Sequence, residues 1–410
     1  MDVLILTTAI FLFRLGDRAG RMVVNKRQEP DMKRRHYNQE QNIYRESLRA
    51  FLEAEVKPHQ DDFEAAGQVP KELWQKAGQN GFLCPWAEEQ YGGVGESDFR
   101  YEQLMIEELA RINESGFFVP LHSSVIAPYI ADYANDEQKK RWMPGIVSGE
   151  KILAIAMTEP STGSDLAGMK SHAVEHDEHW VLNGAKTYIS NGLISDLVIV
   201  AAKTDKNNKH AMGLFVVEAD MAGFERGRRL KKIGMHSQDT AELFFNDVKV
   251  PKANVLGNPQ QGFIYLMQKL AQERLATACG AVAAAQSALD MTIEYTKERS
   301  AFGRNISRFQ NTRFKLAEMK ANIQVAQTYV DQCVLEHNEK RFSADDAAIA
   351  KLHCTELLGK VADECLQLHG GAGYMWEYPI ARLYSAARIL RIYAGTSEIM
   401  KEIISRTMRL

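Results

Sequence analysis

The stretch that decides the fold covers residues 262–280 and reads GFIYLMQKLAQERLATACG. On a helix of 3.6 residues per turn, one face of this stretch carries apolar and small side chains: Leu266, Leu270, Ala276, Thr277 and Gly280. Glu273 lies on that same face. Because such a face normally packs into the core, burial raises the pKa of the carboxyl, which suits a general base near neutral pH. A structural pairing with Arg274 or with a distant lysine is the alternative that this pattern leaves open.

Outward from this helix, the chain falls into three regions of different periodicity. Helical patterns fill residues 36–150, apolar residues follow a period of two over 151–256, and helical patterns return over 257–410. The last region holds four helical runs: 262–298, 309–338, 343–369 and 397–408. The sequence shows no βαβ alternation and no Gly-x-Gly-x-x-Gly after a strand, which argues against a Rossmann domain. We predict an α+β fold with an N-terminal all-α domain, a central β-barrel or sheet domain and a C-terminal four-helix bundle.

Local signals mark individual elements. Asn38 and Gln41 have the spacing of a capping box that opens a helix running to Ala54, with Pro58 after its end. In the β-rich region, Asn183-Gly184 separates two apolar runs and predicts a two-residue hairpin.

Composition limits the class of protein. The 410 residues, 45% hydrophobic and 25% charged, are ordinary for a globular protein of two or three domains. A net charge of −3 argues against a nucleic-acid-binding surface as the main function. The 5 cysteines are scattered and the histidines lack metal-ligand spacing, so we expect a reducing compartment and no metal site. The apolar run Val3–Phe13 is shorter than the about 20 residues that span a bilayer. We therefore expect residues 1–35 to be an unstructured or non-native extension, with no stable membrane insertion; a mitochondrial presequence is the competing interpretation, against which Asp2 and Asp17 argue.

Four polar segments could hold a ligand. After a predicted strand, residues 157–165 (MTEPSTGSD) gather hydroxyls, a Gly and a Pro into a loop that can present N–H groups. Arg299 and Arg304 flank a glycine and could clamp a diphosphate. Residues 367–373 (QLHGGAG) allow close approach of a ligand to the backbone, and residues 395–398 (GTSE) offer free N–H groups at a helix start. Each segment also has a purely structural interpretation, as a surface turn, a solvated helix end, a C-cap or an N-cap.

Together, these segments resemble the acyl-CoA dehydrogenase family. The matching motifs are AMTEPSTGSD at 156–165, KTYISNG at 186–192, KIGMHSQDTAELFFNDVKVP at 232–251, RSAFGRNISRFQ at 299–310, QLHGGAGYMWEYP at 367–379 and YAGTSEIM at 393–400. The resemblance covers residues from about 38 to 410. The phrases AQERL at 271–275 and QLHGGAGYMWEYPIA at 367–381 are most similar to the long-chain branch.

The resemblance implies FAD as cofactor, in a site shared between subunits. Residues of the first polar loop and a later strand would line the flavin ring and ribityl chain: Ile155, Ala156, Met157, Thr158, Gly163, Ser164, Tyr188, Ile189 and Ser190. A neighbouring subunit would hold the diphosphate and adenosine with Arg299, Gln310, Gln367, Leu368, His369, Gly370 and Gly371. The site would be completed by Thr396, Ser397 and Glu398. This sharing implies a homotetramer, a dimer of dimers, or at least a dimer.

The resemblance also implies the reaction, which is α,β-dehydrogenation of acyl-CoA to trans-2-enoyl-CoA in fatty-acid β-oxidation, with electrons passed to electron-transferring flavoprotein. Many family members carry the base directly before the Gly-Thr of the last motif, where this chain has Ala394. The long-chain and isovaleryl branches carry the base in an x-E-R-L phrase, which here places it at Glu273. The thioester oxygen would accept hydrogen bonds from the N–H of Ala394 and a ribityl hydroxyl. Implied substrate contacts are Ser164, Ile264, Ala271, Gln272, Arg274, Ala394 and Gly395.

Departures from the long-chain pattern leave the acyl group open. Ser161-Thr162 replaces the usual Gly-Ala of the flavin loop, and Ile264 stands where related chains often have Tyr. A branched-chain or isoprenoid acyl-CoA dehydrogenase is the closest rival. An acyl-CoA oxidase, which usually has a further C-terminal domain, and a DNA-associated non-catalytic flavoprotein, which needs a basic patch, are the others. We expect a cytoplasmic location in a bacterium, or the mitochondrial matrix in a eukaryote.

Overall fold

The computed structural model describes three ranges of residues: 34–205, 207–208 and 210–409. The chain divides into two units: Met1–Tyr37 and Asn38–Leu410. The extension predicted over residues 1–35 lies outside the described residues apart from its last two. The second unit runs from helices through a sheet to long helices, so the predicted order of the three regions is confirmed. The domain boundaries themselves stay predictions.

The N-terminal part of the second unit is helical. Its elements are α1 Gln39–Phe51, η2 Leu52–Val56, η3 Lys57–His59, α2 Gln60–Ala66, α3 Lys71–Gln79, η4 Glu89–Tyr91, α4 Arg100–Arg111, η5 Leu121–Ile126, α5 Ala127–Tyr133 and α6 Asp136–Ser148. The predicted capping box opens α1, since the Asn38 side chain accepts from the Gln41 N–H and the Gln41 side chain from the Asn38 N–H.

The prediction that this helix ends before Pro58 is wrong. The chain stays helical through a π-helical turn, η2, and a 3₁₀ turn, η3, into α2. Pro58 lies in the first turn of η3, where its missing N–H costs no intrahelical hydrogen bond. The wider turn η2 lies directly before it and keeps the path continuous.

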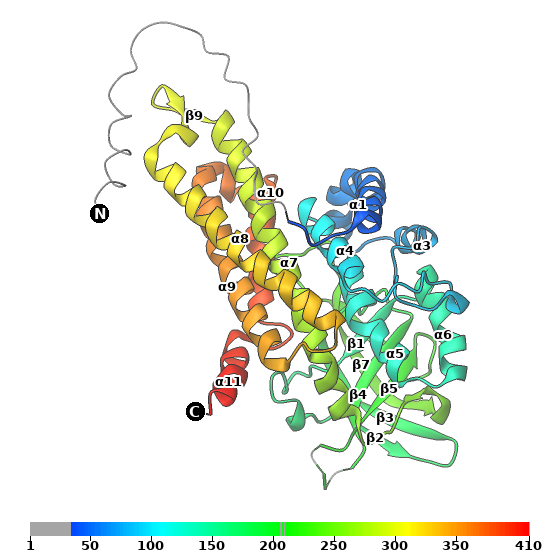
Figure 1. Cartoon of the computed structure of the whole chain (residues 1–410). Coiled ribbons are helices and arrows are strands. Elements are labelled where there is room, and N and C mark those ends of the chain that lie inside the picture. The colour runs from blue at the N-terminus through cyan, green and yellow to red at the C-terminus, as the bar shows by residue number, and fades with distance from the viewer. Residues whose placement is uncertain (1–33, 206, 209, 410) are drawn as a thin grey trace, which may run out of the picture. The chain divides into compact units, whose positions relative to one another are not determined.

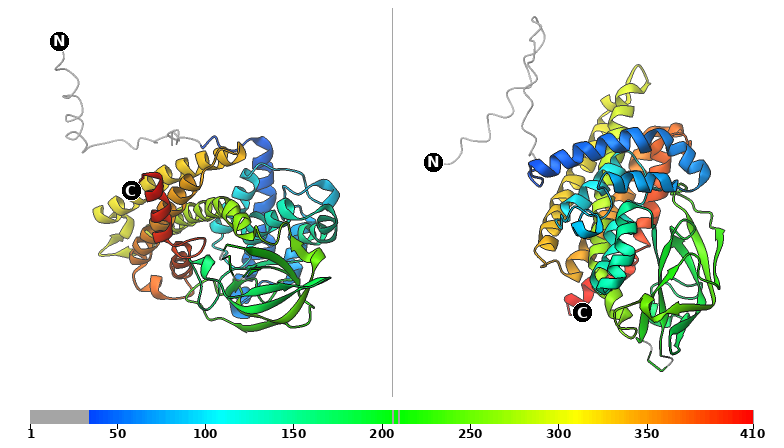
Figure 2. Two further views of the ribbon diagram at one scale, coloured as in Figure 1. Left: turned by 90° about the horizontal axis from the view of Figure 1, so that it is seen from below. Right: turned by 90° about the vertical axis from the view of Figure 1, so that its right-hand side faces the viewer.

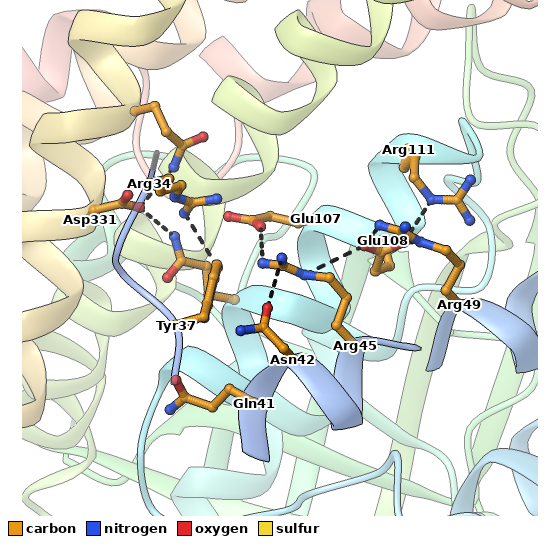
Figure 3. Close-up of polar contacts among 12 residues, drawn as sticks. Arg34, Tyr37, Gln41, Asn42, Arg45, Arg49, Glu107, Glu108, Arg111 and Asp331 are labelled. Atoms are coloured by element: carbon orange, nitrogen blue, oxygen red, sulfur yellow. Dashed lines mark hydrogen bonds and ion pairs between the residues drawn. The ribbon is translucent and has the colours of Figure 1, made fainter. Parts of the chain in front are cut away.

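Ion pairs hold α1 against α4, as Figure 3 shows. Arg49 Nη2 of α1 lies 2.7 Å from a carboxylate oxygen of the buried Glu108 of α4, which also lies 2.7 Å from Arg111 Nε of its own helix. Elsewhere on α4, Ile106 packs in one apolar cluster with Ala276 of the first long helix, α7 (Gly262–Glu298). The N-terminal helices are thereby fixed beside the helix that carries Glu273.

The central region forms an eight-stranded mixed sheet. Its strands are β1 Leu153–Ala156, β2 His172–Glu175, β3 His179–Ser190, β4 Leu197–Lys203, β5 Met212–Glu218, β6 Phe224–Arg229, β7 Thr240–Pro251 and β8 Val255–Leu256. They follow the order β6-β7-β3-β2-β4-β5-β8, and β1 pairs in parallel with β4. An apolar cluster fills one face, with Trp180, Phe215 and Phe245 among its large side chains.

The hairpin predicted at Asn183-Gly184 is wrong, because both residues lie inside the continuous strand β3. The pairing of β3 with β7 shifts register between Leu182 and Gly184. A Cβ on Gly184 would lie 2.1 Å from Ser171 Oγ, so the glycine serves close approach of the neighbouring strand rather than a turn.

The C-terminal region is a bundle of long helices (Figure 1). It comprises α7, β9 Ser300–Ala301, β10 Arg304–Asn305, α8 Gln310–Asn338, α9 Ala344–His369, α10 Pro379–Ala387 and α11 Ser397–Thr407. The β9–β10 hairpin lies at the end of the bundle that points away from the sheet, and the two views of Figure 2 agree on this. Among the described residues, no helix combines the length and apolarity needed to cross a membrane.

Candidate active site

Glu273 is a half-buried residue of α7 whose Oε2 atom is buried and has no hydrogen-bond partner among the described residues. The described part of the chain forms no ion pair with Glu273, so the structural pairing left open by the pattern is absent. Burial raises the pKa of Glu273 to about 7, and the charges of Arg274 and Lys351 work against this rise. A carboxyl with this pKa and a free oxygen can accept a proton near neutral pH.

Two tyrosines that the sequence analysis did not identify lie close to this carboxyl. The hydroxyl of Tyr129 on α5 is buried and unpartnered, and burial together with the charge of Glu273 raises its pKa. Burial also raises the pKa of Tyr393, again with a contribution from Glu273. No local pattern marks Tyr129, because it reaches Glu273 only through the packing of α5 near α7.

The turn at Ala394 and Gly395 lies beside the same turn of α7. Both residues have positive φ, +55° and +97°. Arg274 Nε donates to the Ala394 carbonyl oxygen at 3.3 Å, and Lys351 Nζ of α9 donates to the Gly395 carbonyl oxygen at 2.7 Å. The predicted substrate residues Arg274, Ala394 and Gly395 are therefore brought together with Glu273.

Thr396, Ser397 and Glu398 follow this turn and open α11. The Thr396 hydroxyl caps the helix by accepting from the Ile399 N–H, and the Ser397 hydroxyl donates to Glu356 at 2.7 Å. Glu398 is exposed in the first turn. The predicted N-cap is thus present, and it lies next to the turn that Arg274 contacts.

The polar loop after β1 is braced against β3 by a buried ion pair. Lys186 Nζ lies 2.9 Å from Glu159 Oε1 and 3.0 Å from the Met157 carbonyl oxygen, and the Thr187 N–H donates to Thr158. Of the predicted flavin residues, the structure places Ile155, Ala156, Met157, Thr158, Gly163, Ser164, Tyr188, Ile189 and Ser190 on this loop and the adjoining strands β1 and β3.

Several groups on this loop and strand are free to meet a ligand. Gly163 and Ser164 are exposed, and a Cβ at Gly163 would meet no atom within 4 Å. Tyr188 has φ +61° and is 70% exposed. An exposed aromatic ring beside free hydroxyls and N–H groups fits the ring and ribityl chain of a flavin.

The other predicted cofactor residues lie at the opposite end of the bundle. Arg299 follows the last residue of α7, 26 positions beyond Glu273, which is about 39 Å along a helix. The ring of His369 stacks on Tyr295 at 4.2 Å, which brings the segment Gln367, Leu368, His369, Gly370 and Gly371 to this end. Gln310, the first residue of α8, follows the β9–β10 hairpin. One chain therefore does not bring these residues together with Glu273.

The remaining substrate candidates divide between the surface and a buried network. Ile264 is 51% exposed and Ala271 is half-buried. Gln272 Nε2 donates to the Ser124 carbonyl oxygen of η5 at 2.7 Å. The Ser124 hydroxyl in turn donates to Glu102, a buried carboxyl that the sequence analysis missed. Burial raises the pKa of Glu102 to about 7.

Comparison with protein-family models covers almost the whole second unit. The acyl-CoA dehydrogenase N-terminal domain matches residues 38–150, the middle domain residues 154–248 and the C-terminal domain residues 260–409. The chain belongs to the acyl-CoA dehydrogenase family. As an acyl-CoA dehydrogenase, it is a flavin-dependent oxidoreductase that uses FAD.

Individual relatives agree with this assignment. The chain is 47% identical to the mitochondrial long-chain specific acyl-CoA dehydrogenase of Sus scrofa over 91% of this chain and 87% of that protein. It is 35% identical to the isovaleryl-CoA dehydrogenase of Pongo abelii over 90% and 88% of the two chains. The crystal structure of an acyl-CoA dehydrogenase from Geobacillus kaustophilus has a TM-score of 0.90 and 47% identity, covering 92% of this chain and 100% of that one. A glutaryl-CoA dehydrogenase from Mycobacterium smegmatis in complex with FADH2 has a TM-score of 0.85 and 28% identity, over 91% and 95%.

Proposed function

We propose that this acyl-CoA dehydrogenase acts on long-chain acyl-CoA thioesters in fatty-acid β-oxidation, with Glu273 as the base. The observation that carries the assignment of the base is the unpartnered, buried Oε2 atom of Glu273 on the turn of α7 that contacts Ala394 through Arg274. Ala394, at the other position where family members carry the base, has no titratable group. The 47% identity to a long-chain specific relative, against 35% to an isovaleryl-CoA dehydrogenase, favours the long-chain class.

In this proposal, the carboxylate of Glu273 removes the α-proton of the thioester. This proton is far too weakly acidic for a free carboxylate, so the site must stabilise the negative charge that develops on the thioester oxygen. The N–H of Ala394 would donate to that oxygen, and a preorganised donor of this kind contributes about 2.7–4 kcal/mol. Bound FAD supplies the acceptor for the hydride that leaves the β-carbon.

The remaining site residues take the roles that their positions allow. The β1 loop and Tyr188 would contact the flavin and Ser164 also the substrate, whereas Ile264, Ala271, Gln272, Arg274 and Gly395 would lie along acyl-CoA. Thr396, Ser397 and Glu398 would complete the FAD site. Arg299, Gln310 and residues 367–371 lie at the far end of the bundle and would hold the diphosphate and adenosine of FAD bound to a second copy. We infer a homotetramer built from such dimers, and electron-transferring flavoprotein as the electron acceptor.

A panel of straight and branched acyl-CoA substrates tests this function. Under anaerobic conditions, we expect long straight chains to bleach the yellow flavin fastest and to give the highest kcat/KM with electron-transferring flavoprotein. Faster reaction with isovaleryl-CoA or another branched substrate would reassign the chain to that branch. Rapid turnover with oxygen alone would identify an oxidase.

A further inference from the structure

Lys351 is a fully buried lysine in the N-terminal third of α9, with 0% of its surface exposed. Its ammonium donates to the Gly395 carbonyl oxygen at 2.7 Å, and among the described residues no carboxylate lies within ion-pair distance of it. Buried lysines are rare unless they are paired with an acid. Burial lowers the pKa of Lys351 to about 8, so the charge is retained near neutral pH only against a desolvation penalty. Because burying an unpaired ammonium group costs free energy, we expect Lys351 to have a functional role.

The turn that Lys351 contacts needs external support. Ala394 adopts a left-handed conformation, which costs a non-glycine residue roughly 1–2 kcal/mol. Gly395 follows with φ +97°, and a Cβ there would lie 2.7 Å from Met400 Cε. Two cations from two helices, Arg274 on α7 and Lys351 on α9, bind the two successive carbonyl oxygens of this turn.

These two contacts also set the direction of the backbone donors. Because each peptide unit is planar, binding the carbonyl oxygens of Ala394 and Gly395 fixes the N–H groups of Gly395 and Thr396 that share those planes. The N–H of Ala394 precedes the same turn. The two cations therefore hold the turn by its carbonyl oxygens, and the N–H groups of Gly395 and Thr396 point the opposite way across their peptide planes.

Lys351 also belongs to the electrostatic surroundings of the base. Glu273 is faced by Arg274 on its own helix, Lys351 on α9, Tyr129 on α5 and Tyr393 before α11. Lys351 itself interacts with Arg274, with Glu273 and, more weakly, with two further carboxylates: Glu356 and Glu398. Of these groups, only the two cations favour the ionised form of Glu273.

We propose that Lys351 is a positioning residue of the dehydrogenation: it holds the Ala394–Gly395 turn in register for the thioester oxygen, and its charge favours the ionised form of Glu273. The inference rests on the roles proposed above for Glu273 and this turn. It predicts that Lys351 affects the chemical step and its pH dependence more than the binding of FAD or substrate.

The test compares Lys351→Met and Lys351→Arg with the exposed control Lys360→Met on the same helix. In Lys351→Met, we expect FAD to remain bound, KM to change by less than about threefold and kcat to fall by about 10²-fold, the size of effect that a misplaced reacting group produces. The acid limb of the bleaching rate should move to higher pH, since removal of a cation raises the pKa of Glu273. Lys351→Arg should restore the pH of this limb, and Lys360→Met should match the wild type.

Two results would overturn the proposal. The first is a Lys351→Met enzyme whose kcat per bound flavin and pH profile equal those of the wild type. The second is a loss of FAD or of thermal stability with an unchanged pH profile, which would mean a purely structural role. If Lys351→Met does not fold, Lys351→Gln, which keeps a donor but not the charge, gives the same pH comparison. Failure of Glu273 as the base is recognised separately, because Glu273→Gln would then stay active.

Discussion

At the scale of single residues, Glu273 has the features expected of a base, because its carboxylate forms no ion pair in the described part of the chain. Most buried carboxylate oxygens have a hydrogen-bond partner, whereas Oε2 of Glu273 has none in the described part of the chain, a property that it shares with one oxygen each of Glu64, Glu102 and Asp239. The neighbouring side chains of Arg274 and Lys351 donate hydrogen bonds to backbone carbonyl oxygens instead. The two cations therefore tune the carboxyl without occupying it.

Replacement of Glu273 by Gln should leave a yellow, folded protein that no longer bleaches. A positioned general base contributes about 10²–10⁴-fold, so the anaerobic bleaching rate should fall by at least about 10²-fold while FAD content is unchanged. Glu294→Gln, on an exposed part of the same helix, is the matched control. Full activity of Glu273→Gln would place the base elsewhere.

The wild-type reaction should also report the titration of this group. The acid form of Glu273 cannot accept the α-proton, so only the ionised fraction is active. Because burial raises the pKa to about 7, the bleaching rate should increase as the pH rises through about 7 and then level off. Stopped-flow bleaching between pH 5.5 and 8.5 measures this limb. A rate already at its plateau at pH 5.5 would contradict the raised pKa.

At the scale of elements, α7 both packs against α4 and carries Glu273. Its small residues lie next to α4, and a Cβ at Gly280 would sit at an ordinary contact distance of 3.5 Å from Ile106 Cγ2. The sequence pattern suggests that Ala276 and Gly280 leave room for a ligand beside Glu273. This placement of the acyl chain remains a prediction.

The Gly280→Ala substitution tests whether the acyl chain lies beside Gly280. Glycine in a helix interior costs up to about 1 kcal/mol relative to alanine, so the free energy of unfolding should rise by up to that amount. The added methyl group should narrow the space beside the acyl chain and move the chain-length optimum toward shorter substrates. Gly78→Ala is the contrasting control for stability, because its Cβ would lie 2.4 Å from the Ser148 backbone and should destabilise the protein. An unchanged chain-length profile in Gly280→Ala would remove Gly280 from the pocket.

At the scale of the whole molecule, the candidate cofactor residues fall into two groups at opposite ends of the bundle. One group surrounds Glu273 and the β1 loop, and the other follows α7 at Arg299. Next to the second group, Phe302 on the hairpin is 96% exposed and Tyr374 is 85% exposed. Exposed aromatic residues near a basic residue suit a surface that another copy of the chain covers.

A mixed oligomer tests this sharing. Glu273→Gln and Arg299→Gln chains should each be inactive alone, the first in proton removal and the second in FAD binding. Co-expressed chains that pair at random should recover about a quarter of the wild-type activity, because half of the dimers contain one intact site out of two. The mass in solution should be about 185 kDa for four chains of 46.2 kDa each. A monomer that binds FAD fully would exclude a shared site.

The errors in the predicted elements have a common cause. Asn183-Gly184 has the composition of a turn, but the long pairing of β3 with β7 keeps the strand continuous through it, with a register shift between Leu182 and Gly184. Pro58 predicts the end of a helix, but the preceding π-helical turn accommodates it. Local composition limits the backbone conformations that a segment can adopt. Contacts with neighbouring strands and helices then determine which of these conformations forms.

The sequence by itself determined the order of helices and sheet, the capped helix start at Asn38, the helical run 343–369, and the place of Glu273 on an apolar face. These features follow from periodicity and capping, which act over a few residues. Only the tertiary structure decided that Glu273 is unpaired, and that Arg274 and Lys351 hold the turn at Ala394 and Gly395. The contacts that decide this join residues 120 and 44 positions apart. No local pattern encodes such contacts, because they arise only when α7, α9 and the segment before α11 pack together.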